Sequence, residues 1–182
     1  MDRQKALKRR STSYVDLGAL ELLLNRLKLD YPEVNFIAGT TFCWSPVGHQ
    51  VIYKAKARGI AAVYSLLHEV GHALLDHKRY THDFELLEIE VAAWARAKAI
   101  AGAYDVEIDE NHVQNCLDTY RDWLYRRSIC PSCTTKTLQL DEQPAYVCFN
   151  CSAVWRVAPS RFCRPYRKVK DQIQASTFAA RY

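Results

Sequence analysis

The sequence contains no uninterrupted apolar segment near the roughly 20 residues that a membrane-spanning helix requires. No apolar stretch with a small-residue cleavage site follows the basic first ten residues, so we do not expect a secretory signal. Internal repeats and low-complexity tracts are also lacking. These absences exclude membrane-spanning and repeat architectures, and they predict a soluble protein of the cytoplasm without a membrane partner.

What is present is the composition of an ordinary globular protein, with 49% hydrophobic and 25% charged residues. A length of 182 residues suits one full domain and a small appendage, because single domains usually contain about 100–200 residues. The net charge of +5 is concentrated at the two ends of the chain. We therefore predict four regions: a basic segment 1–13, a main domain 14–128, a cysteine-bearing module 129–158 and a basic tail 159–182.

Hydrophobic periodicity predicts an α+β fold for the main domain. Leucines at three- and four-residue steps indicate a helix over 14–29, which Tyr31-Pro32 ends. Short runs rich in β-branched and aromatic residues predict a small, mostly antiparallel sheet with strands at 34–37, 40–44 and 50–55. Helical patterns then follow over 59–75, 83–103 and 109–127.

The segment His68-Glu69-Val70-Gly71-His72 lies in the first of these longer helices. Histidines four residues apart share one helix face, so both imidazoles can reach one zinc ion at about 2.0–2.1 Å. Glu69 is turned about 100° away, where it can act as general base on a zinc-bound water. Ordinary helix residues are the alternative, but burying these groups in an apolar helix without a shared partner is costly. The pattern predicts metal-assisted hydrolysis of amide bonds.

A glycine inside this helix is a second unusual feature. Gly71 costs about 1 kcal/mol relative to alanine in a helix interior. Its presence predicts that another backbone packs close to the metal-binding turn.

A catalytic zinc ion requires a third protein ligand. Leu75 and Lys78 occupy the positions where the metzincin pattern has glycine and histidine, so that class is excluded. His77 would turn away from the metal on a continuing helix. The remaining candidates lie on the next helix: Glu85, Glu88 and Glu90.

The His68-Glu69-x-x-His72 motif, together with the helix from Glu88 to Ala95, resembles the ImmA/IrrE family of metallopeptidases. The second helix of that family reads Glu-x-x-Ala-Asn-x-Phe-Ala, and alignment on its last residues places Glu88 at the third zinc ligand, with Glu90 as the reserve. Val91 and Ala92 depart from this pattern. Over about 17–101, the resemblance implies a zincin-like, gluzincin-type endopeptidase of cytosolic proteins, several members of which cut helix-turn-helix repressors.

Two cysteine pairs, Cys130-Pro-Ser-Cys133 and Cys148-Phe-Asn-Cys151, are separated by fourteen residues. This spacing is typical of a zinc ribbon, in which four thiolates close a structural site without an open position. A redox role is disfavoured because the two pairs match and no thioredoxin-like pattern accompanies them. The chain is thus predicted to hold two zinc ions, one catalytic and one structural. We expect Cys43 and Cys116 to be buried as small hydrophobic residues.

Aromatic residues alternate with basic ones from Trp155 onward. This mixture predicts either contact with nucleic acid or packing of the tail on the protein through its aromatic rings. Two rival functions follow. A SprT/Spartan-like protease of DNA-bound proteins would need a histidine as third ligand, for which His82 is the candidate. A non-catalytic DNA-binding ribbon protein would need no catalytic role for Glu69.

Overall fold

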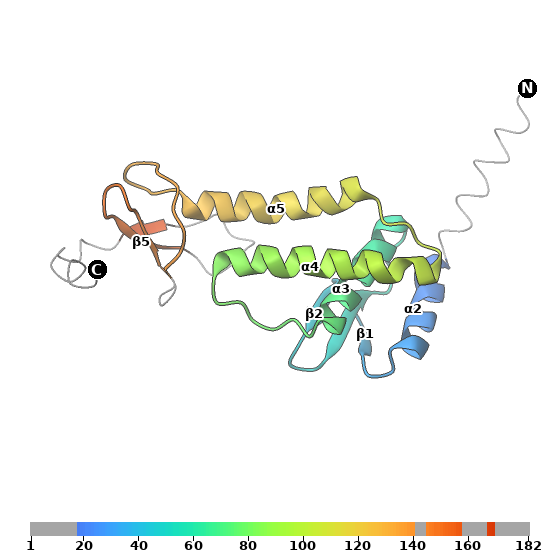
Figure 1. The fold of residues 1–182 in the computed structure, drawn as a ribbon. Helices are drawn as coiled ribbons and strands as arrows, with labels where there is room; N and C mark the ends of the chain where they lie inside the picture. The colour runs from blue at the N-terminus through green and yellow to red at the C-terminus, as the bar shows by residue number, and fades with distance from the viewer. Residues whose placement is uncertain (1–17, 141–144, 158–166, 170–182) are drawn as a thin grey trace, which may run out of the picture. The chain divides into compact units, whose positions relative to one another are not determined.

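The computed structural model describes residues 18–140, 145–157 and 167–169 (Figure 1). The predicted segment 1–13 and most of the predicted tail 159–182 lie outside the described residues. Within them, the α+β prediction is confirmed: the chain forms four α-helices and two small three-stranded sheets. The helices are α2 (Ala19–Asp30), α3 (Ile60–Leu74), α4 (Asp83–Ala101) and α5 (Glu110–Ser128).

Two compact units make up the described chain. The first unit contains the chain up to Arg79 together with Ile89–Val113. The second contains Tyr80–Glu88 and the chain from Gln114 onward. Helices α4 and α5 therefore each contribute residues to both units.

The sheet of the first unit has the strand order β1-β3-β2, with β1 at Asn35–Gly39, β2 at Cys43–Ser45 and β3 at Gln50–Lys54. Strand β2 pairs antiparallel with β3, but β1 pairs parallel with β3. The prediction of a mostly antiparallel sheet was therefore only half correct. The chain reverses after β1 and again after β2, and β3 then inserts between them, so β1 and β3 run in the same direction.

Helices α2 and α3 supply much of the core of the first unit. Helix α2 buries Leu20, Leu24 and Leu27 at the predicted spacing, and it also buries Leu23. The helix ends before Pro32. Helix α3 packs against strands β2 and β3 (Figure 1). Three of its apolar residues, Leu66, Leu67 and Val70, are fully buried. This packing fixes the helix that carries the His-Glu-x-x-His motif.

The close backbone approach predicted at Gly71 is present. A Cβ atom at this position would overlap the carbonyl oxygen of Ala93 in α4. Ala93 and Ala97 are fully buried, so small residues on α4 meet the glycine on α3. The absence of a side chain at Gly71 thus allows α4 to pass close to the motif.

Replacing Gly71 with alanine is therefore expected to destabilise the protein. Overpacking of a well-filled core typically costs about 1–3 kcal/mol, which exceeds the gain of about 1 kcal/mol in helix propensity. Gly102→Ala is a matched control, because its Cβ would meet no atom within 4 Å. Thermal unfolding of both variants tests this; equal melting temperatures would show that α4 can move aside without cost.

The second unit contains three antiparallel strands in the order β4-β5-β6, at Tyr146–Val147, Val154–Val157 and Arg167–Val169. Its small core consists of Cys130, Tyr146, Cys148 and Trp155. Between α5 and residue 140 the chain forms isolated bridges, Ile129 with Lys136 and Gln139 with Tyr146. A module this small depends on additional stabilisation.

A buried ion pair provides part of that stabilisation. Arg127 donates hydrogen bonds to the carboxylate of Asp83 from Nε at 2.6 Å and from Nη2 at 3.1 Å. The hydroxyl of Tyr146 also donates to Asp83, and the indole of Trp155 donates to the carbonyl of Arg127 at 3.0 Å. Within this unit the network joins the first residue of α4, the end of α5 and the strands.

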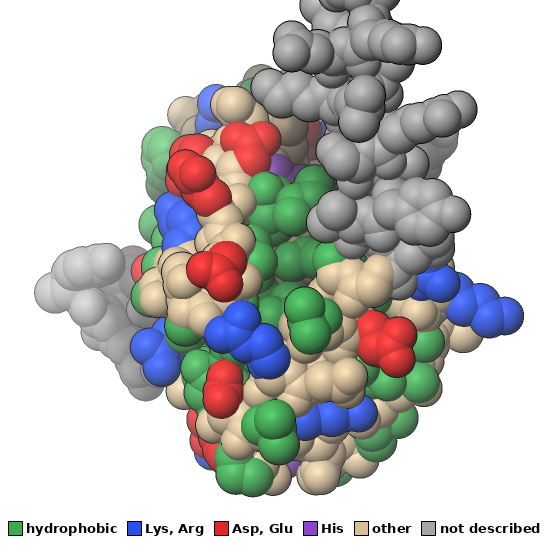
Figure 2. All heavy atoms as spheres, turned by 90° about the vertical axis from the view of Figure 1, so that its right-hand side faces the viewer, with side chains coloured by type: hydrophobic (Ala, Val, Ile, Leu, Met, Phe, Trp, Pro, Cys, Tyr) green, Lys and Arg blue, Asp and Glu red, His purple; other side chains and the backbone are tan. Residues whose placement is uncertain are grey.

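None of the helices among the described residues is long and apolar enough to cross a membrane. The face of the molecule in Figure 2 carries acidic, basic and hydrophobic side chains mixed together. Charges of both signs also occur between the basic ends of the sequence, where residues 11–155 contain 13 basic and 18 acidic residues.

Candidate metal centres

His68 and His72 lie one turn apart on the buried face of α3, as their spacing predicts. Their Nε2 atoms are 3.1 Å apart, and each residue is only 8% exposed. The ring of His68 stacks on Trp94 of α4, with centroids 4.2 Å apart. Its Nδ1 is buried and has no hydrogen-bond partner among the described residues. Burying two converging imidazole nitrogens in an apolar setting costs free energy unless a third group binds to them.

Glu90 of α4 supplies that third group. Its Oε2 lies 3.1 Å from Nε2 of His68, and its Oε1 lies 3.8 Å from Nε2 of His72. Burial favours the neutral carboxyl, but hydrogen bonds from the two histidines outweigh it and lower the pKa of Glu90 to about 2. The ligand atoms of the three residues all lie within 4.8 Å of one another. They therefore form a group that could hold a metal ion.

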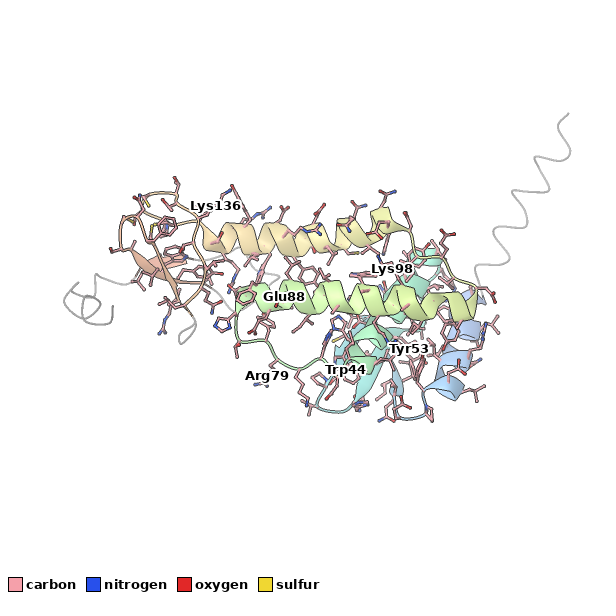
Figure 3. The ribbon with its side chains drawn as sticks, viewed as in Figure 1. Trp44, Tyr53, Arg79, Glu88, Lys98 and Lys136 are labelled. Atoms are coloured by element: carbon pink, nitrogen blue, oxygen red, sulfur yellow. The ribbon has the colours of Figure 1, made fainter. Side chains whose placement is uncertain are left out.

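Glu88, the predicted third ligand, is exposed and is not part of this group (Figure 3). The structure brings the reserve candidate, Glu90, to the histidines instead. The two glutamates are two residues apart on one helix, so their side chains point about 200° apart around its axis. The buried face of α4 carries Glu90, Ala93, Trp94 and Ala97, which identifies Glu90 as the inward-facing carboxylate.

Glu85 and His82 form a separate local cluster at the start of α4. The carboxylate of Glu85 accepts hydrogen bonds from the backbone N–H groups of Thr81, at 2.6 Å, and His82, at 3.1 Å. Hydrogen bonds, that from the His82 side chain foremost, lower the pKa of Glu85 to about 2. This arrangement caps the helix N-terminus. Neither residue belongs to a candidate metal group among the described residues.

Glu69, the predicted general base, adjoins the His68–His72–Glu90 group. Its Oε2 accepts a hydrogen bond of 2.7 Å from the backbone N–H of Trp44 on strand β2. Burial raises the pKa of Glu69, whereas His68, His72 and the Trp44 N–H act in the opposite direction. In the described part of the chain, its Oε1 has no hydrogen-bond partner and stays available. The backbone of β2 thus orients the carboxylate without occupying both oxygens.

The turn after α3 adds a residue that the sequence did not predict at this site. The helix ends at Leu74, and Asp76 adopts a left-handed conformation with φ of 48°. The N–H of His77 then donates to the carbonyl of His72, and that of Asp76 to Ala73, which is the Schellman pattern. This turn brings Nδ1 of His77 to 2.9 Å from Nδ1 of His72. His77 therefore turns toward the histidine pair rather than away from it.

The four cysteines of the two Cys-x-x-Cys pairs form the second group that could hold a metal ion. Sγ of Cys130 lies 3.6 Å from that of Cys151, and Sγ of Cys133 lies 3.4 Å from that of Cys148. Thiolates at about 2.3 Å around a tetrahedral ion are separated by about 3.8 Å, so the spacing is close to that of a bound cluster. The prediction that these cysteines converge is confirmed.

Both cysteine turns have the same backbone geometry. Thr134 donates to the carbonyl of Cys130, and Ser152 donates to that of Cys148. The two residues have left-handed φ values of 61° and 58°. Left-handed backbone costs conformational energy in residues other than glycine, so its presence in both turns indicates that the turns have the same role. That role is to point the cysteine side chains of both turns toward one position.

The pKa values of two of these thiols are shifted in opposite directions. Hydrogen bonds, that from Thr135 foremost, lower the pKa of Cys133 to about 5. Cys151 has its pKa raised to about 12: a hydrogen bond from the Ala153 backbone lowers it, but the neighbouring thiols and burial outweigh that effect. Four close thiols resist losing all their protons, and a bound cation would remove that resistance.

The remaining cysteines differ from their expected burial. Cys43 is exposed on the edge strand β2, and Cys116 is only partly buried on α5. An edge strand of three residues has one face open, so a small apolar side chain there need not be covered. Cys163 lies outside the described residues.

No protein-family model matches the chain, and comparison with curated proteins and with solved structures finds no match.

Proposed function

We propose that the chain is a zinc-dependent endopeptidase, with the catalytic zinc held by His68, His72 and Glu90 and a structural zinc held by the four cysteines. The main support is the position of Glu90. An acidic side chain from a second helix reaches both histidines of a His-Glu-x-x-His motif within 3.1–3.8 Å. Two imidazoles and one carboxylate are a ligand set of catalytic zinc sites, which keep a fourth position open.

The spacing of the ligand atoms fits zinc. Nitrogen and oxygen ligands at about 2.0–2.1 Å around a tetrahedral ion lie about 3.3–3.4 Å apart. Nε2 of His68 is 3.1 Å from both Nε2 of His72 and Oε2 of Glu90. The low pKa of Glu90 means that the carboxylate is already ionised at neutral pH.

Glu69 would carry the proton transfers. A zinc ion bound by the three ligands would lower the pKa of a water molecule toward about 7 and polarise a peptide carbonyl. Oε2 of Glu69 is held by the N–H of Trp44, so Oε1 is the atom that would accept a proton from the attacking water. The same carboxyl group would then donate that proton to the leaving amine nitrogen.

The proposed substrate is a cytosolic protein. Resemblance of the His-Glu-x-x-His helix and the following helix to the ImmA/IrrE family supports a helix-turn-helix repressor as target, within a zincin-like, gluzincin-type domain. An extended peptide segment would pair with an edge of the three-stranded sheet of the first unit. The cysteine module would recruit this regulator or its DNA.

Glu69→Gln is expected to abolish cleavage while both zinc ions remain bound. Loss of a general base typically costs about 100–10,000-fold in rate, and glutamine cannot take up the proton. Comparing the proteomes of cells with wild-type protein and with the variant should reveal substrates that accumulate only in the variant. Glu88→Gln, the same change at an exposed site, is the control and should behave as wild type.

Two alternatives predict other outcomes of this experiment. A DNA-binding ribbon protein without catalysis would give identical proteomes for wild type and Glu69→Gln. The exposed Phe149 at the tip of the second cysteine turn, 78% accessible, and the exposed Arg156 favour some nucleic-acid contact. A SprT/Spartan-like protease would need His82 as ligand, but His82 contacts Glu85 instead. We therefore favour the glutamate-ligated centre.

A further inference from the structure

We propose that His77 and Trp44 are positioning residues of the His68–His72–Glu90 centre. In this arrangement Trp44 holds the turn that carries His77, and His77 orients His72 toward the metal. The inference rests on the proposed metal site but not on peptidase activity, so it can be tested by metal binding alone.

The two ring nitrogens of His72 have different surroundings. Its Nε2 faces Nε2 of His68 and Oε1 of Glu90, at 3.1 and 3.8 Å. Its Nδ1 lies 2.9 Å from Nδ1 of His77. A neutral histidine that binds metal through Nε2 carries its proton on Nδ1, so His72 would donate and His77 would accept. This hydrogen bond fixes both the tautomer and the plane of the His72 ring.

His77 can accept only because the turn after α3 is held in place. The Schellman bond from the His77 N–H to the His72 carbonyl fixes one side of the turn. On the other side, the indole Nε1 of Trp44 donates to the carbonyl of His77 at 2.7 Å. Trp44 is itself 9% exposed on strand β2 (Figure 3). Strand β2 therefore holds the backbone of His77, the residue that orients His72.

Trp44 also contacts the general base, since its backbone N–H donates to Oε2 of Glu69. One residue thus places the Glu69 carboxylate through its main chain and the His77 turn through its side chain. His68 is held differently: its ring stacks on Trp94, and no described residue is a hydrogen-bond partner of its Nδ1. His72 is consequently the ligand whose orientation depends on a hydrogen bond from outside the ligand set.

The first experiment compares His77→Ala with His77→Asn in the full chain. The asparagine Oδ1 lies where the histidine Nδ1 was, so it restores an acceptor that alanine lacks. Removing an outer partner of a metal ligand typically weakens metal binding about 10–100-fold. We expect that loss in His77→Ala and near wild-type affinity in His77→Asn. Zinc affinity is measured by competition with a chelator, and the His68→Ala variant defines the signal of the cysteine site.

The second experiment introduces Trp44→Phe, which keeps an aromatic ring but removes the donor to the His77 carbonyl. Zinc affinity should fall in the wild-type background and change no further in His77→Ala, because Trp44 acts on His72 through the His77 side chain. Retention of the cysteine-site zinc checks that the second unit is folded, and an unchanged thermal unfolding transition checks the first unit, which carries the substitutions.

Three results would overturn the inference: equal weakening by His77→Asn and His77→Ala, no weakening by His77→Ala, or an equal effect of Trp44→Phe in both backgrounds. Absence of any His68-dependent zinc in wild type would instead refute the proposed metal site, and the inference with it. A His77→Ala variant that lost cleavage but kept normal zinc affinity would refute the positioning role and leave the proposed metal site intact.

Discussion

Glu90→Ala should remove one of two zinc ions from the chain, whereas Glu88→Ala should retain both. Glu90 lies 3.1 Å from His68 and is 7% exposed, while Glu88 is exposed on the same helix. Losing a direct ligand should weaken binding by more than the roughly 10–100-fold cost of losing an outer partner. The two variants change the same side chain in one helix, so differences in helix propensity cancel.

The test is the number of zinc ions per chain in each variant, measured by mass spectrometry after dialysis against a weak chelator. Metal loss from Glu88→Ala but not from Glu90→Ala would mean that the centre rearranges around the exposed carboxylate. Loss from neither would show that the histidines hold the ion with a different third group, and the glutamate-ligated centre would have to be abandoned.

Cys148→Ser is expected to unfold the cysteine module and to remove the other zinc ion. Binding of structural zinc contributes about 10–16 kcal/mol to the folding of small zinc modules, far more than their apolar cores supply. Cys148 is 1% exposed and packs with Tyr146 and Trp155, so the variant also leaves a polar hydroxyl in that core.

Limited proteolysis, followed by mass spectrometry of the fragments, should show new cleavage within 129–157 in Cys148→Ser. Cys43→Ser is the matched control, because Cys43 is exposed and outside both metal groups. If the Cys148 variant resisted the protease as well as the control does, the module would not depend on metal for its fold.

The position of the third ligand shows where sequence analysis of this chain was insufficient. Helix α4 is rich in alanine on every side, so the hydrophobic pattern does not identify one buried face. The prediction of Glu88 therefore rested on the family pattern. Val91 lies on the same face of the helix as Glu88. In the structure Val91 is 45% exposed, and Ala93, Trp94 and Ala97 are buried with Glu90. Burial depends on what α4 packs against, including Gly71, which no local pattern specifies.

Other elements were predictable for identifiable reasons. The leucine periodicity of α2 and the apolar helix around the His-Glu-x-x-His motif follow from local hydrophobic spacing. The convergence of the cysteines follows from two matched pairs. The parallel pairing of β1 with β3 and the Asp83–Arg127 ion pair join segments distant in sequence, so neither left a local signal. Asp76 was a weak signal for the His77 turn, because aspartate tolerates left-handed backbone.

Strand β2 illustrates how one hydrogen bond can protect a protein from self-association. Edge strands expose unpaired backbone groups on which another chain can add, and this is a common route to aggregation. On β2, the N–H of Trp44 that points away from β3 is already bound to Glu69, and the strand is only three residues long. The carboxylate therefore also blocks the edge, and it would have to release that N–H before any foreign strand could pair along the whole of β2.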